Sequence, residues 1–130
     1  MPRPSSQHPT ELELEILKIL WRDGPSLAKH VCEEIQPFRK LAYTSVLTIM
    51  NIMAKKKYLK RTKEGKSFVY APVIQEEETT QNMLSDLVNR AFGGSVATAM
   101  VNLLESGDID EQELKELRKL LNRKGREIQS

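Results

Sequence analysis

Hydroxyl side chains recur at helical spacing in the segment TSVLTIMNIMAKKKYL, residues 44–59. At about 100° per residue, Thr44 and Thr48 fall on one side of a helix together with Asn51 and Lys55. The other side is apolar and consists of Val46, Ile49, Met50 and Met53. Small hydroxyl groups can hydrogen-bond base edges or phosphates in the DNA major groove, which an α-helix fits. This polar side, which packing alone does not require, predicts a helix that reads duplex DNA.

Basic residues surround this polar side. Residues 38–66 contain nine Lys and Arg (Arg39, Lys40, Lys55, Lys56, Lys57, Lys60, Arg61, Lys63, Lys66) against one acid, Glu64. Residues 67–113 reverse the balance, with one base, Arg90, against nine acids. The asymmetry predicts a polyanionic partner for the first part of the chain alone. The basic residues expected to contact the DNA backbone are Arg39, Lys40, Lys55, Lys56, Lys63 and Lys66.

Three residues of the second expected helix, His30, Cys32 and Glu34, have side chains that can bind a metal. His30 and Glu34 share a helix face, but Cys32 points about 200° away from each, so the three cannot converge on one ion. Cys32, the single cysteine, is expected to be a small core residue. No Ser/His/Asp set, phosphate loop or paired carboxylates are recognisable. The sequence therefore predicts no enzyme, no metal and no cofactor.

The composition limits the class of protein. A chain of 130 residues and 14.9 kDa holds one ordinary domain or two small ones. Its 39% hydrophobic and 29% charged content is typical of a folded, soluble protein. No apolar run approaches the roughly 18 to 20 residues of a membrane span, and MPRPSSQHPTE lacks the apolar core of a secretory signal. A cytoplasmic protein without a membrane partner is expected.

The elements that must position the polar helix are marked by caps and breakers. Thr10 and Glu13 form a capping box, which predicts a helix to about Arg22. Ser26 is expected to cap a second helix over 27–36, and the polar helix is the third. Two short strands follow, over 58–63 and 67–71, around a turn supplied by Glu64 and Gly65. Three helices and a basic hairpin, in this order, predict a winged helix-turn-helix.

The remainder of the chain predicts three more helices, over 75–92, over 95–105, and after a cap at Asp110 with Glu113. Roughly fifty residues in three helices cannot bury their apolar stripes alone, which favours pairing between chains. The residues expected in the dimer interface are Leu84, Leu87, Val88, Phe92, Met100, Leu103, Leu104, Leu117 and Leu120. The predicted organisation is a flexible tail (1–9), a DNA-binding domain (10–73), a three-helix dimerisation domain (74–124) and a C-terminal tail (125–130).

Several stretches, in this order and spacing, resemble the penicillinase-repressor family of BlaI/MecI type: ELELEILKILW, YTSVLTIMNIMAKKKYLKR, KSFVYAPVIQEEE, FGGS and VNLLE. The resemblance implies a homodimeric transcriptional repressor that binds a dyad operator, with one winged helix in the major groove at each half-site. It also implies that Ser45 and Thr48 read bases, and the helical geometry adds Thr44.

Resemblance to the antibiotic-response members implies one further partner. In those members a membrane sensor-protease signal leads to cleavage within the dimerisation segment, between an Asn and a large apolar residue. The matching bond here is Asn102–Leu103, although VNLL also fits an ordinary core helix. A regulatory protease is thus an expected partner. The copper-responsive branch carries paired Cys-x-Cys motifs, which this chain lacks.

Two other hypotheses remain open at this stage. In the first, the winged helix is a protein-interaction module whose basic face docks an acidic partner. In the second, the protein is a ligand-gated regulator with a small-molecule pocket between its two halves. Sequence-selective binding to duplex DNA distinguishes the repressor from the docking module, because both lose affinity in salt.

Overall fold

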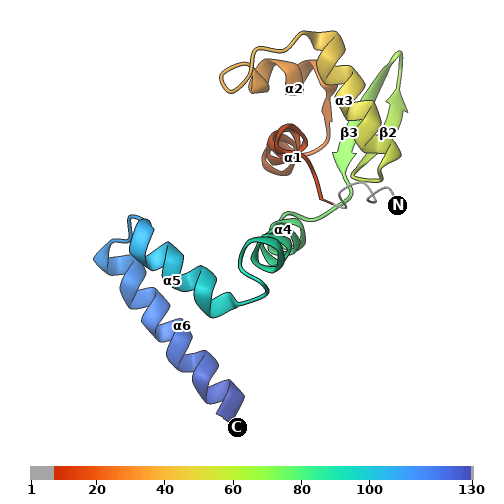
Figure 1. Cartoon of the computed structure of the whole chain (residues 1–130). Coiled ribbons are helices and arrows are strands. Elements are labelled where there is room, and N and C mark those ends of the chain that lie inside the picture. Colours follow the sequence, from red (N-terminus) through yellow and green to blue (C-terminus); the bar gives the residue numbers. More distant parts are fainter. Residues whose placement is uncertain (1–7, 130) are drawn as a thin grey trace. The chain divides into compact units, whose positions relative to one another are not determined.

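The structure, a computed structural model, describes residues 8–129 and forms two compact units. The first unit runs to Leu84 and the second begins at Ser85. Residues 1–7 of the predicted N-terminal tail lie outside the described residues, whereas Pro9 is buried. The elements (Figure 1) are α1 (Glu11–Asp23), β1 (Ser26–Leu27), α2 (Ala28–Ile35), α3 (Tyr43–Lys55), β2 (Leu59–Glu64), β3 (Ser67–Pro72), α4 (Glu76–Ala91), α5 (Val96–Ser106) and α6 (Glu111–Gln129).

The first helix begins at the predicted capping box. The Thr10 hydroxyl accepts a hydrogen bond from the Glu13 amide at 3.2 Å, and the Glu13 carboxylate accepts one from the Thr10 amide at 2.9 Å. These two bonds satisfy amides that a helix start leaves without partners. The chain leaves α1 at Gly24, whose φ of 80° a residue with a side chain rarely adopts.

The predicted cap at Ser26 is wrong. Ser26 and Leu27 form the short strand β1, which pairs antiparallel with β3 through Ser26↔Tyr70 and Leu27↔Val69. The Ser26 hydroxyl donates to the Gly24 carbonyl at 2.8 Å instead of accepting from the helix. Helix α2 therefore starts one residue later than predicted, at Ala28, and its N-cap Leu27 makes no side-chain capping bond.

The predicted hairpin is present as β2 and β3, but it belongs to a three-stranded antiparallel sheet of order β1-β3-β2. Glu64 pairs with Ser67, so the turn consists of Gly65 and Lys66 rather than Glu64 and Gly65. Gly65 takes the first turn position with a φ of 65°. Beyond Leu59 every residue of β2 is exposed, so the hairpin extends from the core as a wing.

One hydrophobic core holds the first unit together. Its buried residues are Ile16, Leu17, Ile19, Leu20, Ala28, Val31, Ile35, Val46, Met50, Met53, Tyr58, Leu59 and Tyr70. They come from all three helices and from the hairpin, as the predicted helical stripes require. Trp21 adds a bond from its indole nitrogen to the Ile74 carbonyl at 3.0 Å. This arrangement of three helices with a small antiparallel sheet is a winged helix, which confirms the predicted fold class.

The second unit buries much less. Ala99 is buried, but many large apolar side chains of the unit are exposed, among them Leu87, Val96, Val101, Leu103, Leu104, Leu120, Leu121 and Ile128. An apolar groove of about 320 Å³ lies between α5 and α6 and is lined by residues that include Met100, Leu104 and Leu117. Helix α6 extends to Gln129, so residues 125–129, predicted as a tail, continue the helix. None of the described helices is both long and apolar enough to cross a membrane.

Candidate nucleic-acid interface

Helix α3, hereafter the recognition helix, presents two different sides. Val46, Met50 and Met53 are fully buried in the core of the first unit. Thr44, Ser45 and Thr48, the predicted base readers, are all exposed near the start of the helix. The division follows the helical period, which turns these polar residues away from the core.

The groups at the start of the recognition helix define what it can bind. Thr48 donates its hydroxyl proton to the Thr44 carbonyl at 2.9 Å, so its oxygen can accept a bond while its methyl group stays available for apolar contact. The N-cap residue, Ala42, supplies no side-chain capping bond. Uncapped amides at a helix start favour anions such as phosphate. The helix start thus offers acceptors and methyl groups for bases, and amides for the backbone.

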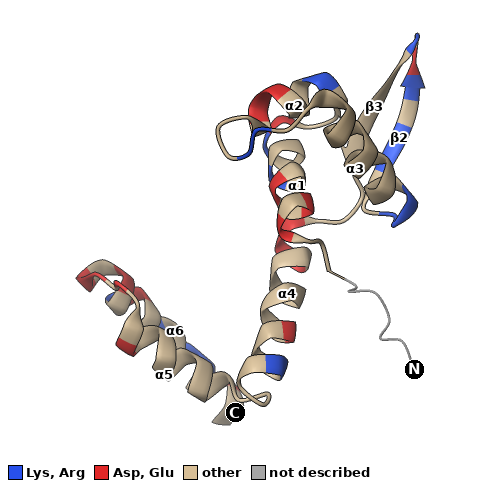
Figure 2. Ribbon diagram, turned by 45° about the horizontal axis from the view of Figure 1, so that its top comes forward, with Lys and Arg blue, Asp and Glu red and all other residues tan. Residues whose placement is uncertain are grey.

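The exposed cations gather beside this helix. Lys55 ends the helix, and Lys63 and Lys66 lie on the wing and its turn; all three are exposed. Lys40, in the loop before the helix, is also exposed. Figure 2 shows the basic residues along β2 and after α3, while the start of α4 is acidic. These positions suit contacts with phosphates on either side of a major groove.

Two of the cations predicted to contact the DNA backbone, Lys56 and Arg39, form ion pairs with carboxylates of α1. The Lys56 ammonium lies 2.9 Å from Glu13 Oε2, and Glu13 is only 4% exposed. Arg39 lies 3.3 Å from Glu15 and 3.6 Å from Glu11. The buried carboxylate of Glu13, which also closes the capping box, requires a cation, and Lys56 supplies it.

Asn51 connects the recognition helix to the wing. Its side-chain oxygen accepts hydrogen bonds from the Tyr70 hydroxyl at 2.8 Å and from the Arg61 guanidinium at 3.0 Å. The Arg61 guanidinium also lies 4.2 Å from the centroid of the Phe68 ring. Burial raises the pKa of the Tyr70 hydroxyl, which therefore keeps its proton and donates at neutral pH. The sequence placed Asn51 on the polar side of the helix but did not reveal these partners.

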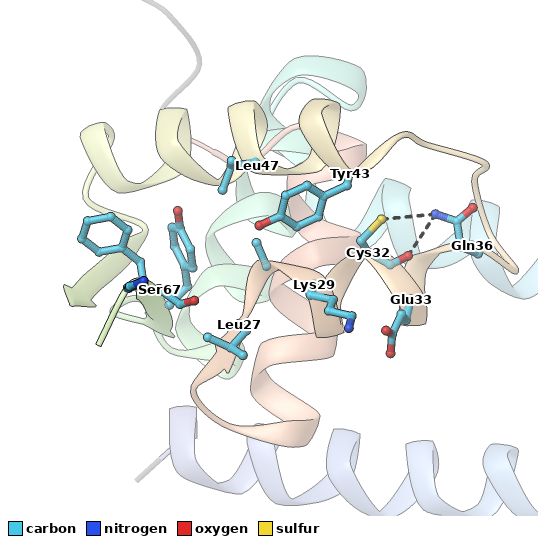
Figure 3. A pocket seen from close by; sticks show the side chains of 12 residues that line it. Leu27, Lys29, Cys32, Glu33, Gln36, Tyr43, Leu47 and Ser67 are labelled. Atoms are coloured by element: carbon cyan, nitrogen blue, oxygen red, sulfur yellow. Dashed lines mark hydrogen bonds between the residues drawn. The ribbon is translucent and has the colours of Figure 1, made fainter. Parts of the chain in front are cut away.

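A cavity of about 700 Å³ adjoins the same helix within the first unit (Figure 3). Tyr43 and Leu47 line it from the recognition helix, and Leu27 and Cys32 line it from β1 and α2. The lining also includes two exposed cations, Lys29 of α2 and Lys66 of the wing turn. Lys29 was not among the predicted DNA contacts, because an isolated lysine in the first turn of a helix carries no specific signal.

A second cluster lies where α1 meets α2. Ligand atoms of Asp23, His30 and Glu34 lie within 4.8 Å of one another. Arg22 already forms ion pairs with both carboxylates, and His30 Nε2 lies 2.7 Å from Asp23. The guanidinium and the imidazole hold the pKa of Asp23 well below its usual range. A resident guanidinium repels a metal cation, so we interpret the cluster as an ion-pair network that fastens α2 to α1. Cys32 lies outside it, as predicted, beside Gln36.

A winged helix with an exposed polar recognition helix between basic residues defines a DNA-binding protein. The family model described as penicillinase repressor matches residues 9–123. The chain belongs to the penicillinase repressor family, which confirms the predicted membership. Proteins of this family are DNA-binding transcription regulators and not enzymes, so the prediction that this chain is not an enzyme is also confirmed.

Individual relatives have low sequence identity to this chain, but the similarity extends over most of their length. The methicillin resistance regulatory protein MecI of Mammaliicoccus sciuri is 28% identical, over 86% of this chain and 91% of the relative. The penicillinase repressor of Bacillus licheniformis is 28% identical, over 86% of this chain and 88% of the relative. The solution structure of the DNA-binding domain of the repressor BlaI is 28% identical in sequence, with a TM-score of 0.49. The matched region covers 60% of this chain and 93% of the BlaI domain chain.

Proposed function

We propose that this protein represses transcription by binding a dyad operator as a homodimer, with one recognition helix in the major groove at each half-site. The observation that carries the proposal is the exposure of Thr44, Ser45 and Thr48 opposite the fully buried side of the same helix. Family membership supports it, because the curated relatives are named repressors and resistance regulators.

Within this proposal, hydroxyl side chains contact the bases and lysine side chains contact the DNA backbone. Thr44, Ser45 and Thr48 read base edges, since they lie at the exposed start of the recognition helix. Exposed cations hold the DNA backbone: Lys29, Lys40, Lys55, Lys63 and Lys66. Lys56 is assigned to the stability of the fold because its ammonium neutralises the buried Glu13 carboxylate. Arg39 forms partly exposed ion pairs with Glu11 and Glu15 and is kept as a backbone contact.

The homodimer rests on the apolar surface of the second unit. Leu103 and Leu104 line the groove between α5 and α6, and both they and Leu120 of α6 are about half exposed or more. Covering the exposed half of one leucine contributes on the order of 1 kcal/mol, so the exposed leucines of both copies together favour association. The other predicted interface residues that stay partly or largely exposed are Leu84, Leu87, Val88, Phe92, Met100 and Leu117. A second copy of this chain is the partner that would cover them.

Cleavage at Asn102–Leu103 by a regulatory protease would end repression by dividing the dimerisation segment. Both side chains are exposed on α5, with Leu103 62% exposed. The bond lies inside helix α5, so the helix must open locally before a protease can act. The side-chain amide of Asn102 also donates to the Thr98 carbonyl at 2.9 Å. A chain truncated after Asn102 lacks α6. It is expected to be monomeric in sedimentation and to bind operator DNA much more weakly than the full chain.

Selection of binding sites from a random duplex pool tests the repressor proposal. The expected product is an inverted repeat whose half-sites lie about one helical turn apart, or a multiple of it. Recovery of no motif, with weak and salt-sensitive binding alone, would favour the other hypothesis, a module whose basic face docks an acidic protein.

A further inference from the structure

The wing is anchored through β3, which pairs with β1 and buries Tyr70, whereas strand β2 has little packing of its own. In β2 only Leu59 is buried, and the five residues that follow it are exposed. The ladder with β3 fixes the shape of the hairpin, and the pairing of β3 with β1 holds its base, so the exposed part of the wing depends on side-chain contacts for its position beside the recognition helix. The side-chain bonds of Asn51 with Tyr70 and Arg61 join the two elements directly.

We propose that Asn51, Arg61 and Tyr70, hereafter the Asn51 network, position the wing so that its lysines meet phosphates while the recognition helix lies in the groove. The inference rests on the proposed function and assigns these three as positioning residues rather than base readers. The Asn51 oxygen is the common acceptor, so the network joins the middle of α3 to both strands of the wing.

The chemistry of the acceptor favours a role at a DNA surface. Lys56 is held by a carboxylate, which cancels its charge. Arg61 is held by a neutral amide oxygen and an aromatic ring, so its full positive charge remains beside the wing lysines. A neutral acceptor thus orders the arginine without weakening the attraction of this face for phosphate.

The geometry also explains the choice of tyrosine in β3. Tyr70 is 1% exposed, and its ring belongs to the core of the first unit. Its hydroxyl reaches Asn51 at 2.8 Å and would be an unsatisfied buried donor without that bond. Phenylalanine at this position keeps the packing of the ring and removes the bond to the recognition helix.

The test compares Tyr70→Phe with Tyr58→Phe in the full chain. Tyr58 is a matched control because its ring is buried in the same core but contacts Lys56 rather than Asn51. Hydrogen–deuterium exchange of the amides of residues 60–68 should become faster in Tyr70→Phe and stay unchanged in Tyr58→Phe. In Tyr70→Phe, the slope of log affinity against log salt on a random-sequence duplex should also become shallower by about two. Each lost phosphate contact changes this slope by ~0.9, and the contacts of Lys63 and Lys66 are both expected to be lost.

Two variants of Asn51 test whether its side-chain oxygen is the acceptor that orders the wing. Asn51→Asp keeps an acceptor for both donors and should retain slow exchange in the wing, whereas Asn51→Ala should lose it. Wing exchange and salt slope in Tyr70→Phe that match those of Tyr58→Phe would overturn the positioning role. Failure of the unaltered protein to bind any duplex would instead overturn the proposed function, and the exchange data would still judge whether the network orders the wing.

Discussion

Replacement of Lys56 by methionine tests whether this lysine stabilises the fold or contacts DNA. Lys56→Met keeps the apolar stem of the side chain but removes the ammonium that lies 2.9 Å from Glu13 Oε2. The Glu13 carboxylate is 4% exposed and would keep its bond from the Thr10 amide. The substitution therefore leaves a buried charge with half of its former partners.

The expected loss of stability follows from this geometry. Removing one partner of a fully buried ion pair costs about 3 to 5 kcal/mol. Because the Lys56 side chain is 36% exposed, water already screens the pair, and we expect a loss of about 2 kcal/mol instead. DNA binding should change little, because the Lys56 ammonium is already paired with the Glu13 carboxylate.

Urea unfolding, followed by the fluorescence of Trp21, measures the stability of the first unit, since Trp21 is the single tryptophan. Lys63→Met is the matched control: this exposed wing residue should change stability by less than about 0.5 kcal/mol. Its salt slope on duplex DNA should fall by about 0.9, the value for one phosphate contact. The reasoning is refuted if Lys56→Met lowers the salt slope as Lys63→Met does while stability stays unchanged.

Three further predictions concern other parts of the molecule. Thr48→Ala should cost roughly 1 to 3 kcal/mol on operator DNA, measured by anisotropy, and little on random DNA; equal losses on both would exclude base reading. Leu120→Asp should shift sedimentation from dimer to monomer while far-UV circular dichroism keeps its helical signal; a persistent dimer would contradict the interface. Lys57→Gly should raise the free energy of unfolding in urea by about 0.5 to 1 kcal/mol, because Lys57 adopts a φ of 70°; destabilisation would contradict this.

Features set by neighbouring residues could be predicted from the sequence. The helix N-caps show this: the bond from the Glu13 amide to Thr10 forms as predicted, and the Glu113 amide donates to the predicted cap Asp110 at 2.8 Å. The buried side of the recognition helix, with Val46 and Met50, also follows from helical spacing alone. These local rules were sufficient to predict the winged helix and the exposed polar side of α3.

Features that depend on distant partners could not be predicted. Strand β1 forms because Ser26 pairs with Tyr70 across the fold, and a two-residue strand has no periodic signal. Lys56 pairs with Glu13, which lies 43 residues away in the sequence, so the sequence did not reveal that this lysine neutralises a buried carboxylate. Asn51 lies on the predicted polar side, but its partners on the wing depend on the register of the hairpin.

The most direct test of the central claim compares two duplexes at the same salt concentration. One carries the inverted repeat recovered by selection, and the other carries the same bases in scrambled order. The account predicts affinities that differ by about 10³-fold or more, with two chains bound per operator duplex. Equal affinities for the two duplexes, or a single chain bound per operator, would contradict it.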